Sequence, residues 1–115
     1  MDASWFEPIV EGMYQAVNGG GTGRIAMVPG LDICGKTGTA ENPRGRDHST
    51  FLSFAPKDNP KIAISVYVEN GGFGASAALP IASLLEEYYL TDTIRRPALL
   101  DYVRNMTINY PAYDR

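Results

Sequence analysis

The sequence is poor in the residues that build disulfides and metal sites. Its 115 residues include one cysteine, Cys34, and one histidine, His48. A single cysteine excludes an intramolecular disulfide, and this pair alone is too small a set for a zinc site. We therefore expect no metal and no cofactor.

The sequence also lacks long apolar runs. None approaches the roughly 20 residues that a membrane-spanning helix needs. The first eleven residues have neither the basic start nor the small-residue cleavage site of a signal peptide. The chain is therefore expected to be either cytosolic or an internal segment of a longer protein.

Positive charge is not in excess. Ten lysines and arginines stand against 13 aspartates and glutamates, for a net charge of −3. Nucleic-acid-binding domains usually carry a basic face, so no nucleic-acid partner is expected. The apolar content of 44% is ordinary for a globular protein, and the length suits one domain with one core.

Hydrophobic periodicity predicts an α+β fold, with an antiparallel sheet of about three strands flanked by helices. Glycines 19–21 end the first helix, and a glycine-rich loop follows them. Residues 1–115 are read as a single partial domain whose part from 91 to 115 is a tail. The predicted helices are 5–17, 75–90 and a short one at 97–105, and the predicted strands are 31–40, 50–55 and 61–69.

Several apolar and aromatic residues are expected in the core. Cys34 is read as a small buried residue. His48 is expected to make a hydrogen bond at the start of a strand. The expected core residues of the helices are Trp5, Phe6 and Tyr14 in the first, and Ala78, Ile81, Ala82, Leu85, Tyr88 and Tyr89 in the second.

The most informative stretch is Cys-Gly-Lys-Thr-Gly-Thr-Ala-Glu at residues 34–41. Residues 30–37 satisfy the phosphate-binding pattern G-x-x-x-x-G-K-[ST], but that loop needs a helix after the lysine. The residues after Thr37 include two glycines and a proline and cannot continue as a helix, and Asp32 would repel phosphate. We therefore read Lys36-Thr37-Gly38 as a strand at the edge of a cleft.

Such a strand provides what acyl transfer requires. Lys36 offers a cation for a substrate carboxylate, and Thr37 and Thr39 offer hydroxyl groups. Gly38 lets a peptide backbone come close. A backbone N–H can stabilise an oxyanion.

Four ordered blocks around this motif resemble the end of a class B penicillin-binding transpeptidase, most like penicillin-binding protein 2. These blocks are Gly20–Gly23, Gly35–Glu41, the pair His48–Pro56 and Asn59–Val66, and Ala77–Ala82. The resemblance implies a partial penicillin-binding or serine β-lactamase-like fold. It implies a parent protein anchored in the cytoplasmic membrane with its catalytic domain in the periplasm, where it cross-links peptidoglycan.

The resemblance also assigns roles. Lys36 would hydrogen-bond the serine of an S-x-N motif. Thr37 and Thr39 would bind the carboxylate of a D-Ala-D-Ala stem peptide or of a β-lactam. The N–H of Thr39 would be one of two oxyanion donors. Lys36 and Thr39 are thus the catalytic candidates, and Lys36, Thr37, Gly38 and Thr39 the substrate-binding ones.

The family's nucleophile is not in this sequence. No serine here is followed by lysine at the third position or by asparagine at the second, so S-x-x-K and S-x-N are both missing. We expect the chain alone to be inactive, to need the rest of the domain as its partner, and to self-associate through uncovered strand residues. A D,D-carboxypeptidase or β-lactamase fragment, and a non-catalytic interaction module, stay open as alternatives.

Overall fold

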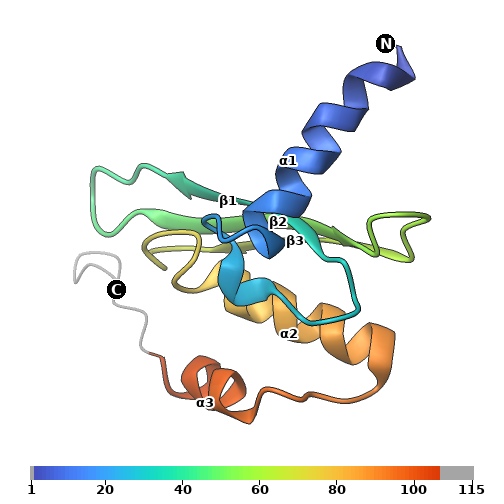
Figure 1. Cartoon of the computed structure of the whole chain (residues 1–115). Coiled ribbons are helices and arrows are strands. Elements are labelled where there is room, and N and C mark those ends of the chain that lie inside the picture. The colour runs from blue at the N-terminus through green and yellow to red at the C-terminus, as the bar shows by residue number, and fades with distance from the viewer. Residues whose placement is uncertain (1, 107–115) are drawn as a thin grey trace.

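The computed structural model describes residues 2–106 and shows a three-stranded antiparallel sheet with helices on both sides (Figure 1). The strands are β1 (Cys34–Ala40), β2 (His48–Ala55) and β3 (Ile62–Val68), in the order β1-β2-β3. The helices are α1 (Phe6–Asn18), α2 (Ala78–Thr91) and α3 (Pro97–Asn105), and the short 3-10 turns are η1 (Ala3–Trp5) and η2 (Arg24–Ala26). The predicted α+β fold is confirmed, and each predicted element lies close to its expected bounds.

The central strand β2 separates the two faces of the sheet by its alternation. Ser49, Phe51, Ser53 and Ala55 are buried, whereas Leu52 between them is exposed. The buried set faces α2, because Ser49 Oγ accepts a hydrogen bond from the N–H of Ala78 at 2.9 Å. Phe51 therefore lies in the core between the sheet and α2.

Helix α1 lies on the other side of the sheet from α2 (Figure 1), and it is anchored at its end and by an ion pair between Glu11 and Lys57 at 2.6 Å. Val17 is buried, and Asn18 Nδ2 donates to the carbonyl of Ile33 at 2.8 Å. Trp5 and Phe6 are 63% and 49% exposed, so their assignment to the core is wrong. The first turns of α1 project away from the sheet (Figure 1).

Helix α2 lies on the sheet with a different face from the one predicted. Ala78 and Ala82 are buried as expected, but Leu85 and Tyr89 are 52% and 62% exposed. Tyr88 is also exposed. Two adjacent glutamates, Glu86 and Glu87, are completely buried instead.

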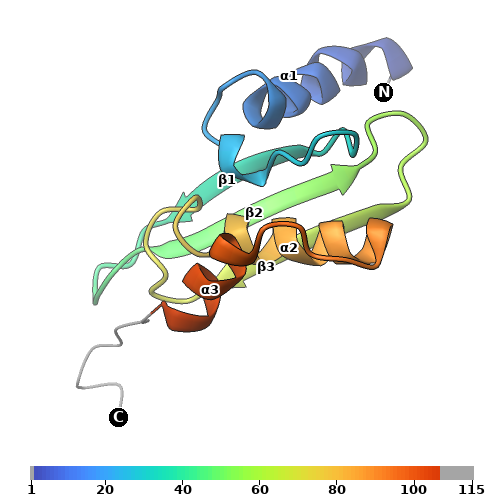
Figure 2. The ribbon, with the colours of Figure 1, turned by 60° about the horizontal axis from the view of Figure 1, so that its bottom comes forward.

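The chain after α2 returns along this helix and forms α3 (Figure 2). The hydroxyl of Tyr102 in α3 donates to the carbonyl of Ser76 at 2.6 Å, which fixes α3 near the start of α2. The last part of the predicted tail, residues 107–115, lies outside the described residues. Within residues 2–106, no helix has the length and apolar content needed to cross a bilayer.

Candidate functional site

The Lys-Thr-Gly motif lies fully extended on an outer strand of the sheet. Lys36, Thr37, Gly38 and Thr39 occupy the middle of β1, which pairs with β2 in this three-stranded sheet. A phosphate-binding loop would instead turn into a helix after the lysine. The strand conformation rules out that alternative.

The register of β1 on β2 decides which way each side chain points. Lys36 pairs with Leu52, whereas Thr37 pairs with Phe51 on the α2 side of the sheet. Thr39 shares this side with Thr37, because successive side chains of a strand alternate between its faces. The ammonium group and the two hydroxyl groups therefore leave the strand on opposite faces, and a ligand along its edge can meet both.

Lys36 and Thr39 are exposed, and Thr37 and Gly38 are half-buried. Lys36 Nζ donates to the carbonyl of the next residue, Thr37, at 2.7 Å, so its ammonium group lies close to the backbone of β1. The four predicted site residues thus form one accessible strip.

Two neighbouring loops hold the threonine hydroxyls of this strip. Thr37 Oγ1 donates to Thr22 Oγ1 at 3.3 Å, which links β1 to the glycine-rich loop after α1. Thr39 Oγ1 accepts a hydrogen bond from the N–H of Gly74 at 3.3 Å. A methyl group at Gly74 would lie 2.6 Å from the carbonyl oxygens of Gly38 and Thr50, so only glycine allows this approach.

Gly38 also has a role inside the fold. A methyl group there would meet the hydroxyl of Thr50 on the neighbouring strand. Glycine at this position is therefore needed for the close packing of β1 on β2, in addition to any room it leaves for a ligand.

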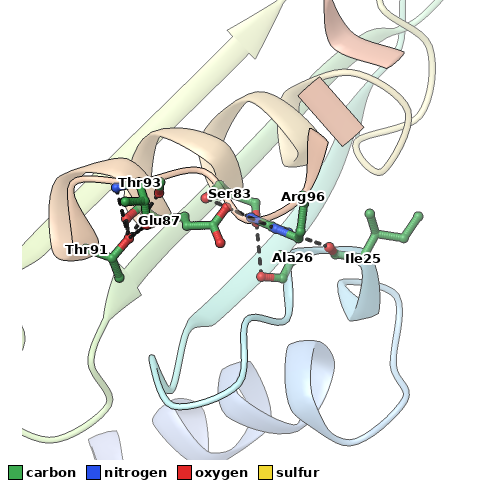
Figure 3. Close-up of polar contacts among 7 residues, drawn as sticks. All are labelled: Ile25, Ala26, Ser83, Glu87, Thr91, Thr93 and Arg96. Carbon is green, nitrogen blue, oxygen red and sulfur yellow. Dashed lines mark hydrogen bonds and ion pairs between the residues drawn. The ribbon is translucent and has the colours of Figure 1, made fainter. Parts of the chain in front are cut away.

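A polar cluster around Arg96 supports the loop that precedes β1 (Figure 3). The Arg96 guanidinium donates to Glu87 at 3.2 Å, to the Ser83 hydroxyl at 2.8 Å and to the Ile25 carbonyl at 3.1 Å. The Ser83 hydroxyl in turn donates to the carbonyl of Ala26 at 3.0 Å. Arg96 thus joins α2, η2 and the segment after α2, and offsets the charge of the buried Glu87.

Glu86 is buried beside a neutral partner instead of a cation. Its carboxyl group accepts a hydrogen bond from Ser53 on β2, and its second oxygen has no partner among the described residues. Burial raises the pKa of Glu86 to about 7, although the Ser53 hydrogen bond acts in the opposite direction. Ionising a carboxyl group in such a site is costly, so the neutral form is favoured.

Cys34 and His48 have the structural roles that the sequence predicts. Cys34 is completely buried, and burial raises the pKa of its thiol to about 11. His48 begins β2, and its Nδ1 accepts a hydrogen bond from the N–H of Asn70 at 3.0 Å. Within residues 2–106, no group of three or more possible metal ligands comes together.

Sequence reasoning missed the residues that position the strip. Thr22 stands in a loop that already marks a resemblance, but nothing in the sequence indicates that it reaches Thr37. Arg96 follows a second arginine and carries no local signal of a partner. Glu86 and Glu87 are not among the core residues that the sequence predicts, because only the fold brings Ser53 and Arg96 to them.

The chain matches known proteins over most of its length. The family model for the penicillin binding protein transpeptidase domain matches residues 1–85. The peptidoglycan D,D-transpeptidase MrdA of Haemophilus influenzae is 38% identical over 109 residues, covering 80% of this chain and 17% of that protein. MrdA of Acinetobacter baumannii is 36% identical and covers 84% of this chain and 16% of its own length.

Solved structures agree with these matches. The structure of Pseudomonas aeruginosa PBP2 in complex with WCK 5153 has a TM-score of 0.70 at 39% identity, covering 79% of this chain and 20% of that one. The imipenem acyl-enzyme complex of penicillin-binding protein A from M. tuberculosis has a TM-score of 0.62 at 36% identity, covering 73% and 19%. This chain thus spans about a fifth or less of these relatives, and it belongs to the penicillin-binding protein transpeptidase family, with relatives of the penicillin-binding protein 2 type.

Proposed function

We propose that this chain supplies the substrate-binding strand of a serine D,D-transpeptidase that cross-links peptidoglycan stem peptides. The observation that carries the proposal is the extended, accessible course of Lys36–Thr39 along the outer strand β1. The Lys36 ammonium group provides positive potential for an anionic peptide end and a donor for the serine of S-x-N. The N–H of Thr39 serves as one of two oxyanion donors.

The two threonines are suited to binding a carboxylate. The Thr39 hydroxyl accepts a hydrogen bond from Gly74, and a hydroxyl that accepts can still donate its own hydrogen. The bond from Thr37 to Thr22 is long at 3.3 Å, so a carboxylate offers Thr37 a stronger, charge-assisted partner. D-Ala-D-Ala stem peptides and β-lactams both carry such a carboxylate.

The chain alone is proposed to be catalytically inactive. Acylation needs a serine nucleophile activated by lysine, and no S-x-x-K or S-x-N stands in the sequence. We propose that the rest of a transpeptidase domain, in a parent anchored in the cytoplasmic membrane, supplies both motifs. Incubation of this chain with a fluorescent penicillin should leave no stable covalent adduct, and such an adduct would refute the proposal.

A chimera tests the positive part of the proposal. This chain replaces the matching segment of H. influenzae MrdA, and acylation by fluorescent penicillin is followed over time. We expect the chimera to be acylated. Lys36→Ala should slow acylation by roughly 100-fold, the scale for removing a donor that stabilises the transition state. Lys61→Ala, a change on another strand, is the matched control and should leave the rate unchanged.

The same chimera separates the alternatives. A long-lived adduct favours the transpeptidase, whereas rapid release of the hydrolysed drug favours a β-lactamase. Release of D-alanine from a stem peptide without cross-linking favours a carboxypeptidase. A folded chimera that is never acylated would contradict the catalytic proposal and favour a non-catalytic module.

A further inference from the structure

A closely bonded turn holds the Thr22 hydroxyl beside the substrate-binding strip. Thr22 stands between Gly21 and Gly23, and the carbonyl groups of both glycines accept hydrogen bonds from N–H groups of η2, at 3.2 Å and 2.9 Å. The Thr22 hydroxyl in turn lies 3.3 Å from that of Thr37. The place of the Thr22 hydroxyl relative to Thr37 therefore depends on η2.

Two side chains attach η2 to α2 and to the segment after it (Figure 3). The Arg96 guanidinium donates to the carbonyl of Ile25 at 3.1 Å. The Ser83 hydroxyl donates to the carbonyl of Ala26 at 3.0 Å. The guanidinium also donates to the Ser83 hydroxyl at 2.8 Å, so Arg96 orients the second bond as well as making the first. Both attachments of η2 therefore depend on Arg96.

The end of α2 brings Arg96 to this position. Asp92 adopts a left-handed conformation with φ of 60° and ends the helix. The Thr91 hydroxyl donates to the carbonyl of Glu87 at 2.7 Å and accepts a hydrogen bond from the N–H of Thr93 at 3.3 Å, which fixes the reversal of the chain. The Glu87 carboxylate then binds Arg96 Nε at 3.2 Å. The guanidinium is thus fixed on α2 and reaches η2 from there.

We propose that Arg96 is a positioning residue for substrate recognition, because it sets, through η2 and Thr22, the place of the Thr37 hydroxyl that binds the substrate carboxylate. This inference rests on the proposed function. When Thr37 donates its hydrogen to a carboxylate, its oxygen can still accept a hydrogen bond, and the Thr22 hydroxyl is within reach. That bond orients Thr37 and strengthens its donation, because hydrogen bonds in a chain polarise one another.

The position requires an arginine because its acceptors surround one planar group. Nε bonds Glu87, and the two terminal nitrogens bond the Ile25 carbonyl and the Ser83 hydroxyl. A lysine ammonium group keeps the positive charge beside Glu87, but one nitrogen cannot serve the other two groups in the same fixed geometry. Arg96→Lys therefore separates the ion pair that stabilises the fold from the bonds that position η2.

The chimera with H. influenzae MrdA tests the inference through two reagents, a fluorescent penicillin and its methyl ester, which lacks the anionic carboxylate. Arg96→Lys should slow acylation by the penicillin about two- to ten-fold, the net effect of roughly one hydrogen bond, and change the rate with the ester by less than about two-fold. A purely structural role would lower both rates alike, because it would reduce the active fraction. Arg95→Lys, at the exposed neighbouring arginine, is the matched control and should leave both rates unchanged.

Two further variants test the route from Arg96 to Thr37. Ser83→Ala removes the hydrogen bond to the Ala26 carbonyl and should show the same selective loss with the penicillin. Thr22→Val removes the hydroxyl but keeps the shape of the side chain. In that background Arg96→Lys should have no further effect, since the two changes interrupt one route and cannot add.

Thermal unfolding verifies that each chimera is folded before the rates are compared. The inference is overturned by an Arg96→Lys chimera that matches the wild type, by equal losses with penicillin and ester, or by additive effects of Arg96→Lys and Thr22→Val. A folded wild-type chimera that is never acylated would overturn the proposed function and this inference with it, so the two failures are distinguishable.

Discussion

Replacing Glu86 with glutamine tests whether α2 is held on the sheet by a carboxyl group that keeps its proton. Burial raises the pKa of Glu86 from 4.5 to about 7. Between these values the unfolded chain loses the proton and the folded chain retains it. The free energy of unfolding should therefore fall as the pH rises through this window and level off above pH 7.

The size of the effect follows from the shift. A difference of about 2.5 pKa units, at about 1.4 kcal/mol each, gives about 3.5 kcal/mol as an upper limit. Glu86→Gln cannot ionise but can still hydrogen-bond Ser53. The variant should match the wild type near pH 4.5 and exceed its stability by up to about 3.5 kcal/mol at pH 8.

Urea unfolding followed by far-UV circular dichroism measures this difference at a series of pH values and a fixed low protein concentration. Subtracting the free energy of unfolding of the wild type from that of the variant at each pH removes the contributions of titrating groups common to both. Ser53→Ala removes the hydrogen bond that lowers the pKa of Glu86, so it should extend the window to higher pH. A difference between Glu86→Gln and wild type that stays constant from pH 4.5 to 8 would refute the reasoning.

Three further changes probe the packing by urea unfolding. Arg96→Ala leaves the buried carboxylate of Glu87 without its ion pair and should lower the free energy of unfolding by about 3–5 kcal/mol. Surface ion pairs typically contribute about 0–1 kcal/mol, so a decrease below about 1 kcal/mol would contradict the proposed role of this pair. Gly12→Ala adds a methyl group to α1 with nothing within 4 Å, so it should stabilise the chain by about 1 kcal/mol, and a loss would show a hidden contact. Gly74→Ala places a methyl group 2.6 Å from the Thr50 carbonyl and should destabilise the chain clearly, whereas a neutral result would mean that the loop can move away.

The sequence predicts the strand that carries the site because its signals are local. Glycines and a proline after Thr37 exclude a helix, and the alternation in residues 61–69 fixes the strand beside the central one. The end of α1 follows from the glycines that come directly after it. These features need no knowledge of distant residues.

The orientation of α2 could not be predicted, because it depends on groups far away in sequence. The apolar stripe through Leu85 and Tyr89 is the obvious core face. The fold instead buries Glu86 and Glu87, and Ser53 and Arg96 each bond one carboxylate oxygen of this pair while the second oxygens have no partner among the described residues. Likewise, the exposure of Trp5 follows from where the sheet ends, which helix periodicity does not reveal.

The link from Arg96 to the Ile25 carbonyl spans 71 residues of sequence. During synthesis from the N-terminus, the stretch leading into β1 therefore leaves the ribosome long before the residue that ties it down. Until Arg96 emerges, the growing chain has the Lys-Thr-Gly strand without the hydrogen bond from Arg96 to the Ile25 carbonyl. A nascent chain halted before Arg96 would therefore lack the hydrogen bond that joins this residue to the stretch leading into β1.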